Sequence, residues 1–128
     1  MEDEHSGLEY AELNRELVRR FPVFSSGYEE VRARWEGEAP GPHIVFGDLF
    51  APHIIALLDQ QEHDAELRQL FGFLELLVAS KDAKVVEVAA ASVIERLNDR
   101  KDWREAARLY MGPATLRVSH DMEQAWGP

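Results

Sequence analysis

The chain has 128 residues, of which 45% are hydrophobic and 30% charged, a length and composition typical of one compact domain. It contains no cysteine, which excludes disulfides, thiolate zinc sites and cysteine nucleophiles. The formal charge of -10 opposes contact with a nucleic-acid backbone, and no apolar stretch approaches the roughly 20 residues of a membrane span. We therefore expect one acidic domain, residues 1–128, whose partners include neither nucleic acid nor membrane.

The N-terminal region predicts a tail followed by a helix. The first ten residues, MEDEHSGLEY, carry acids and no apolar run, so we expect neither a signal peptide nor a transit peptide, and we expect a cytoplasmic protein. Residues 1–7 are predicted to be a flexible acidic N-terminus. Ser6 and Glu9 have the spacing of a capping box, which predicts a helix start. The apolar stripe of this helix is Leu13, Leu17 and Phe21, and Pro22 ends it.

A second helix and a linker are predicted next. Ser26 and Glu29 repeat the capping-box spacing and predict a short helix. Residues 37–43, GEAPGPH, hold two prolines and two glycines, which predict a linker between the N-terminal helices and the helical core. Asp48 is then predicted to cap a helix that has Pro52 in its first turn. The apolar residues before it are expected to be irregular, with a short strand as the alternative.

The second half of the chain predicts further helices at regular intervals. Helices are expected to begin near Asp64, Asp82 and Asp102, and another after Gly112 and Pro113. Small residues at positions 89–92 allow a close approach between helices. This spacing predicts antiparallel pairs stacked as a small HEAT-like or armadillo-like bundle. The expected fold is a single all-α domain of about six to seven short helices without a sheet.

Two groups of chemically suggestive residues are interpreted as structural. Ser119, His120 and Asp121 follow one another on a predicted helix, so they point about 100° apart and cannot form a catalytic relay. An arginine stripe alternates with acidic residues, which is typical of a salt-bridged surface rather than an anion site. We find no convergent acid, base and nucleophile, so we expect no enzyme and no cofactor. The stripe consists of Arg100, Arg104 and Arg108.

The acidic residues are concentrated in the first three fifths of the chain. Residues 48–75 alone hold 6 acids and 1 base, whereas residues 76–128 hold 8 of each. This asymmetry is typical of a surface that receives a basic partner, although it also serves solubility. A divalent-cation site at the turn before Asp64 is an alternative, but a hydrated turn capped by Asp64 is favoured because this turn contains no Glu-x-x-His pair. The predicted contact residues are Asp59, Glu62, Asp64 and Glu66, followed by a second set, Glu29, Glu30 and Trp35.

Three short segments resemble those of a known group of proteins. The segments are RFP at 20–22, PHIVFGDLF at 42–50 and LYMGPATL at 109–116. Together they resemble a family of small all-helical bacterial domains of poorly assigned function, whose members occur in the manner of immunity proteins of polymorphic toxin systems. The resemblance implies a stoichiometric inhibitor of a toxin domain and no catalytic motif. The residues that carry it are His43, Phe46, Gly47, Asp48, Gly112, Pro113 and Leu116.

Charge and resemblance together lead to one hypothesis and one alternative. The hypothesis is a non-catalytic acidic domain that binds a basic toxin domain and neutralises it. The alternative is an adaptor that holds a helical peptide in a groove of the helical bundle. A homo-oligomer is compatible with either. Trp126, two residues from the end, is expected either to dock on the core or to be an exposed handle.

Overall fold

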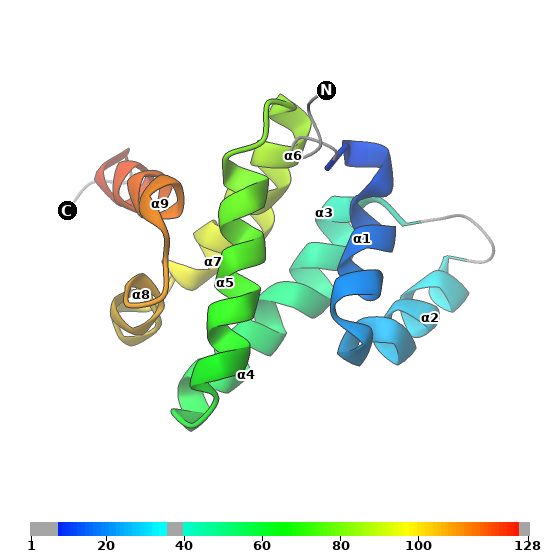
Figure 1. Cartoon of the computed structure of the whole chain (residues 1–128), viewed down its shortest axis with the longest axis horizontal. Coiled ribbons are helices and arrows are strands. Elements are labelled where there is room, and N and C mark those ends of the chain that lie inside the picture. Colours follow the sequence, from blue (N-terminus) through cyan, green and yellow to red (C-terminus); the bar gives the residue numbers. More distant parts are fainter. Residues whose placement is uncertain (1–7, 36–39, 126–128) are drawn as a thin grey trace.

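The computed structural model describes residues 8–35 and 40–125, and every regular element in these ranges is a helix (Figure 1). The predicted all-α fold with seven helical segments is confirmed for this part of the chain. The predictions for residues 1–7, for Ser6 and for Trp126 fall outside the described residues. In chain order the segments are η2 (Tyr10–Glu12) with α1 (Leu13–Arg20), η3 (Pro22–Phe24) with α2 (Ser25–Arg34), α3 (Pro42–Val45) with η4 (Phe46–Phe50) and α4 (Ala51–Gln60), α5 (Asp64–Val78), α6 (Ala83–Glu87) with η5 (Val88–Ile94) and α7 (Glu95–Leu97), α8 (Lys101–Arg108), and α9 (Pro113–Ala125).

The first N-terminal helix keeps the predicted apolar stripe, but the second lacks its predicted cap. The first segment starts as a 3-10 turn, and its α-helical part buries Leu13 and Leu17 as expected. Pro22 follows its end, also as expected. The second capping box is wrong, because Ser26 is already the second residue of α2. The 3-10 turn η3 runs directly into α2, so the helix starts without a side-chain cap.

The first long helix, residues 42–60, is continuous through a π-helical middle, η4. Asp48 therefore does not cap a helix, and the predicted linker is too long, since Pro42 and His43 already belong to α3. The apolar residues before Gly47 are helical rather than irregular or extended. Pro52 gives the physical reason, because its ring has no N–H and crowds the carbonyl four residues earlier. A π turn, in which the Ala51 N–H donates to the Phe46 carbonyl, widens the helix just before the ring.

The helix of residues 83–97 also has a π-helical middle, η5, which packs against η4 in the helix of residues 42–60. Of the small residues at 89–92, Ala89 and Ser92 are buried, whereas Ala91 is exposed. The side chains of His43 and Ser92 hydrogen-bond between the two helices, with 2.8 Å between Nδ1 and Oγ. The family-like segment around Gly47 thus forms one side of a helix crossing.

Helix α5 lies in the middle of the molecule and forms a hairpin with the helix before it and the helix after it (Figure 1). These consecutive hairpins supply the predicted antiparallel pairs. The predicted cap at Asp82 is confirmed, because its carboxylate accepts the Lys84 N–H at 3.0 Å. Asp64 and Asp102 lie in the first turns of their helices, as expected, but neither is the N-cap. The N-cap of α5 is His63, and that of α8 is Arg100.

A cluster of phenylalanine rings joins the N-terminal helices to the core. The ring of Phe21 lies 5.6 Å from that of Phe73 on α5, and the ring of Phe24 lies 6.0 Å from that of Phe50. Phe50 and Phe73 in turn have centroids 6.0 Å apart at a steep angle. Such tilted pairs stabilise by about 0.5–1.5 kcal/mol beyond their buried area. The N-terminal helices are therefore part of the same hydrophobic core as α4 and α5.

A single carboxylate on α5 holds the start of α9. Glu75 accepts hydrogen bonds from the amides of Ala114 and Thr115, each at 3.0 Å, and from the Thr115 hydroxyl at 2.8 Å. Burial raises the pKa of Glu75, but these hydrogen bonds and the charge of Arg117 outweigh it, so the pKa is lowered. A Cβ at Gly112 would lie 2.6 Å from this carboxylate. Because Gly112 has no Cβ, the Glu75 carboxylate can approach this closely and cap α9.

Candidate functional site

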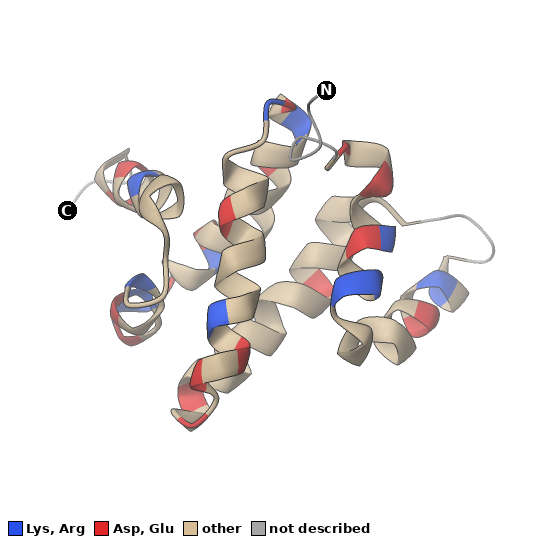
Figure 2. Ribbon diagram, in the orientation of Figure 1, with Lys and Arg blue, Asp and Glu red and all other residues tan. Residues whose placement is uncertain are grey.

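The four acids of the first predicted set gather where α4 turns into α5, and we call Asp59, Glu62, Asp64 and Glu66 the acidic turn. Figure 2 shows the acidic residues of this connection at the lower end of the ribbon. The turn is sharp because Gln61 adopts a left-handed conformation with φ of 60° and ends α4. Three of the four side chains are exposed, and that of Glu66 is half-buried.

Three of these carboxylates already have neighbours inside the chain. Asp59 accepts from the indole N–H of Trp103 at 3.2 Å, and Glu66 pairs with His53 Nε2 at 2.8 Å. Asp64 accepts from the Tyr110 hydroxyl and from Arg68, and these two hydrogen bonds lower its pKa. The turn is thereby braced against α8 and the residues that follow it.

Glu62 differs from its neighbours in the turn. It is exposed, and no hydrogen bond or ion pair joins it to another residue within ranges 8–35 and 40–125. Asp59 accepts a hydrogen bond from the neutral Trp103 indole and forms no direct ion pair within the described residues, although the charge of Arg100 also acts on it. Both ions are available to a partner's bases. They are the acids of this turn that a charge-reversal experiment can test without breaking an internal ion pair.

An apolar groove of about 270 Å³ opens beside the acidic turn. Leu58 and Leu67 are 6% and 2% exposed and contribute apolar floor, whereas Leu109 is 82% exposed. The sequence pattern did not single out Leu109 as a surface residue of a site. A signal for its exposure is present, however. Trp103, Ala106 and Tyr110 recur at the spacing of one helix face, and Leu109, about 100° from Tyr110, falls outside that face. The groove is lined by Leu58, Gln61, Leu67, Ala106, Leu109 and Tyr110.

The second predicted set lies elsewhere on the molecule. Glu29 and Glu30 are exposed on α2, and Trp35, which follows α2, is 40% exposed. Figure 1 shows α2 and the α4–α5 connection at different ends of the structure. Glu29 also pairs with Arg32 on its own helix, at 3.5 Å. The structure therefore does not bring the two predicted sets together in one site.

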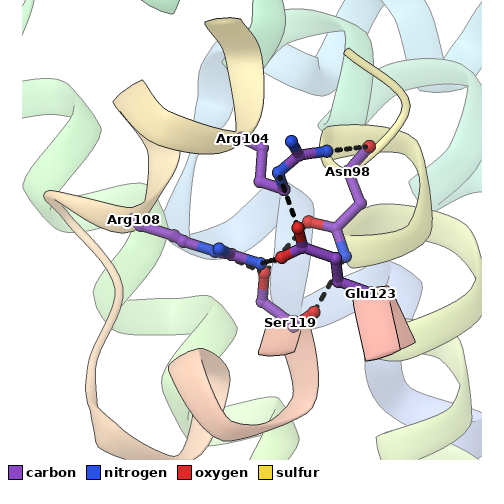
Figure 3. Close-up of polar contacts among 5 residues, drawn as sticks. All are labelled: Asn98, Arg104, Arg108, Ser119 and Glu123. Carbon is purple, nitrogen blue, oxygen red and sulfur yellow. Dashed lines mark hydrogen bonds and ion pairs between the residues drawn. The ribbon is translucent and has the colours of Figure 1, made fainter. Parts of the chain in front are cut away.

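The arginine stripe of α8 forms internal contacts, as the salt-bridged interpretation expects (Figure 3). Arg108 donates to Glu123 at 2.7 Å, and Arg104 reaches the same carboxylate at 3.7 Å. The hydrogen bond from Arg108 is the main cause that lowers the pKa of Glu123. Beneath this pair, the Ser119 hydroxyl donates to Asn98 at 2.9 Å and accepts from Arg108 at 3.0 Å. This network holds α9 against α8.

The catalytic arrangements considered from the sequence are not assembled in the described residues. Ser119 is buried and engaged by Asn98 and Arg108, whereas His120 and Asp121 are exposed. The pair of His43 and Ser92 contains a base and a hydroxyl, but within the described ranges no carboxylate hydrogen-bonds the histidine. Its contact joins two helices at their crossing. Among the same residues, no three His, Asp or Glu side chains form a group that would hold a metal ion.

Within the described part of the chain, no helix has the length and apolarity that crossing a membrane requires. No curated protein matches the sequence, and no solved structure matches it either. A family model does match, over residues 14–127, and its description is a domain of unknown function, DUF7674. This range contains all the residues that carried the resemblance to a poorly characterised family, from His43 to Leu116. The chain therefore belongs to the DUF7674 family of domains of unknown function.

Proposed function

We propose that this chain is a non-catalytic acidic domain that binds a basic protein, and that the acidic turn is its contact surface. The observation that carries the proposal is an exposed pair of carboxylates, Asp59 and Glu62, that form no direct ion pair within the described residues and lie beside an apolar groove. Acidic groups at an exposed tip accelerate encounter with a basic partner, and an adjacent apolar surface supplies contact area after encounter. The net charge of -10 also favours a positively charged partner.

The finer form of the proposal is that the partner is a toxin domain and the chain its immunity protein. It is supported by the resemblance of the segments around His43 and Gly112 to domains that occur in that manner. A stoichiometric inhibitor needs a rigid complementary surface rather than a reactive group, and bracing by Trp103 and Tyr110 gives the acidic turn such rigidity. The expected complex forms in the cytoplasm of the producing cell.

The second candidate is an adaptor that holds a helical peptide in the apolar groove. It is favoured by the exposure of Leu109, since a helix face laid over this residue would cover it. The two candidates differ in salt dependence. Capture by acidic groups weakens as ionic strength rises, whereas binding in an apolar groove changes little.

The test is affinity capture from a lysate of the source cell with three versions of the full chain as bait. The versions are the natural chain, Glu62→Lys in the acidic turn, and Glu87→Lys, an exposed control with the same charge change on α6, at the other end of α5. The proposal expects one basic protein that is retained at low salt, released at high salt, and lost only from the Glu62→Lys bait. Retention that high salt leaves unchanged would support the adaptor, and equal retention by all three baits would contradict the acidic turn as the contact surface.

A further inference from the structure

The groove beside the acidic turn is small, and its exposed edge is apolar. Pockets that enclose small molecules span roughly 300–1,000 Å³, whereas this groove holds about 270 Å³. Its floor is leucine from α4 and α5, and its exposed edge is Leu109. No carboxylate or base is among the lining residues, so the groove itself selects apolar groups. One protein side chain is the scale of group that fits.

The walls of the groove are held in place before any partner arrives. The ring of Tyr110 stacks on that of Phe71, with 5.8 Å between centroids and 18° between planes. Its hydroxyl donates to Asp64 at 2.5 Å, and the Arg68 guanidinium lies over the Tyr110 ring, 5.6 Å from the ring centroid. The Trp103 indole holds α8 to Asp59. A preformed groove binds with a smaller loss of conformational entropy than one that must be ordered on contact.

The rim of the groove carries negative charge. Gln61 and Tyr110 line the groove, and their neighbours Glu62 and Asp64 belong to the acidic turn, Asp64 through its direct contact with the Tyr110 hydroxyl. Arg68 neutralises Asp64 in part, at 3.0 Å. Glu62 and Asp59 form no direct ion pair within the described residues, although the charge of Arg100 acts on Asp59. An apolar side chain that enters here therefore has carboxylates beside it, which favour Lys or Arg as its neighbours in the partner.

We infer that the groove receives one large apolar side chain of the basic partner, and that Lys or Arg residues flanking this side chain contact Asp59 and Glu62. The inference rests on the proposed function and adds the chemistry of the partner's contact segment: an apolar anchor between bases. The anchor contributes affinity through burial against Leu58, Leu67 and Leu109, whereas the bases contribute rate of association and orientation.

The experiment titrates the full chain, labelled with nitrogen-15, with three synthetic peptides. The first peptide has one tryptophan flanked on each side by two lysines. The second has alanine in place of the tryptophan, and the third keeps the tryptophan but has glutamates in place of the lysines. The expected result is amide shifts around the groove, and a dissociation constant at least about tenfold lower for the tryptophan-lysine peptide than for the alanine-lysine peptide, the change that about 1.4 kcal/mol produces. The glutamate peptide is expected not to bind.

Variants assign these effects to the groove and to the acids. Leu109→Ser is expected to remove the preference for tryptophan but to keep the salt dependence, and its fold is expected to persist because Leu109 is 82% exposed. Val23→Ser, at another exposed apolar residue, is the matched control and should change nothing. Glu62→Lys should weaken both lysine peptides by a similar factor and keep the tryptophan preference. A thermal melt of each variant verifies that it is folded.

The outcomes separate the inference from the function on which it rests. Equal, salt-sensitive binding of the tryptophan and alanine peptides would overturn the groove as an anchor site and leave the acidic turn as a contact surface. A preference for tryptophan that survives Leu109→Ser would place the anchor elsewhere and overturn the inference. Failure of either lysine peptide to shift the acidic turn, or equal binding of the glutamate peptide, would overturn the proposed function together with the inference.

Discussion

Glu75, on α5, and the acidic turn, where α4 turns into α5, use carboxylates in opposite ways. Glu75 is half-buried, and it accepts three hydrogen bonds from the first turn of α9. Glu62 is exposed and has no such bond within the described residues. A carboxylate that satisfies backbone amides stabilises the fold, whereas one that keeps only water around it is free to attract a partner. The acidity of this chain therefore has two separable consequences.

The largest expected effect comes from removing the carboxylate that holds α9. Glu75→Ala leaves the amides of Ala114 and Thr115 without their acceptor, and we expect a loss of about 2–4 kcal/mol in the free energy of unfolding, the sum expected for a lost helix cap and charged hydrogen bonds. Urea denaturation followed by circular dichroism measures it. Thr115→Val serves as a partial control, because it removes only the hydroxyl bond. If Glu75→Ala lowered the free energy of unfolding no more than Thr115→Val does, the backbone amides of α9 would gain nothing from the Glu75 carboxylate.

The same carboxylate makes stability depend on pH. The pKa of Glu75 is lowered in the folded state, so the stabilisation by its ionised form is complete above the unfolded-state pKa and is lost as pH falls through the folded-state pKa. We expect the stability of the natural chain to fall more steeply than that of Glu75→Gln between about pH 7 and about pH 3, a window that spans the ordinary glutamate pKa of about 4.3. Denaturation curves across that range measure the difference. Parallel pH profiles would contradict the cap.

A smaller effect is expected at the second anchor of α9. Ser119→Ala removes the hydroxyl that joins Asn98 to Arg108 and leaves the buried Asn98 oxygen without this donor. We expect a destabilisation of about 1–2 kcal/mol, as for one buried hydrogen bond whose partner is left unsatisfied. Ser26→Ala, at an exposed position of α2, is the matched control. The two values are compared in the same denaturation assay, and equal values would mean that the network contributes nothing to docking α9.

The smallest effect on stability is expected at the acidic turn itself. Glu62→Lys removes no hydrogen bond and no ion pair of the described residues, so we expect a change within about 0.5 kcal/mol in the free energy of unfolding. The same assay measures it beside Glu75→Ala. A large loss would show that the turn is a structural element, and the contrast between the two kinds of carboxylate would fail.

The fold was predictable where local signals and packing agree, and it was not where they differ. Asp82 follows a break in the apolar pattern and caps a helix as expected. Asp48 has an equally good local pattern, but the buried rings of Phe46 and Phe50 keep the helix continuous through it, and a π turn accommodates Pro52. Whether a helix begins at Asp48 or continues through it depends on tertiary packing, which a single sequence does not show directly.

The candidate site was also predictable in part. Charge density alone placed Asp59, Glu62, Asp64 and Glu66 on one turn, and the structure brings them there. The groove could not be foreseen, because it depends on how α8 lies against the ends of α4 and α5. The same holds for Glu75, which accepts hydrogen bonds from residues about 40 positions away, Ala114 and Thr115.

The most direct test of the central claim is the rate of association between the chain and the basic protein captured by it, measured at increasing ionic strength. The account predicts that the rate for the natural chain falls steeply with salt, as for electrostatically steered association. Glu62→Lys is predicted to lower the rate at low salt and to flatten this dependence, while Glu87→Lys, with the same charge change on α6, has the smaller effect. Equal rates for the two variants at every salt concentration would contradict the acidic turn as the surface that captures a partner.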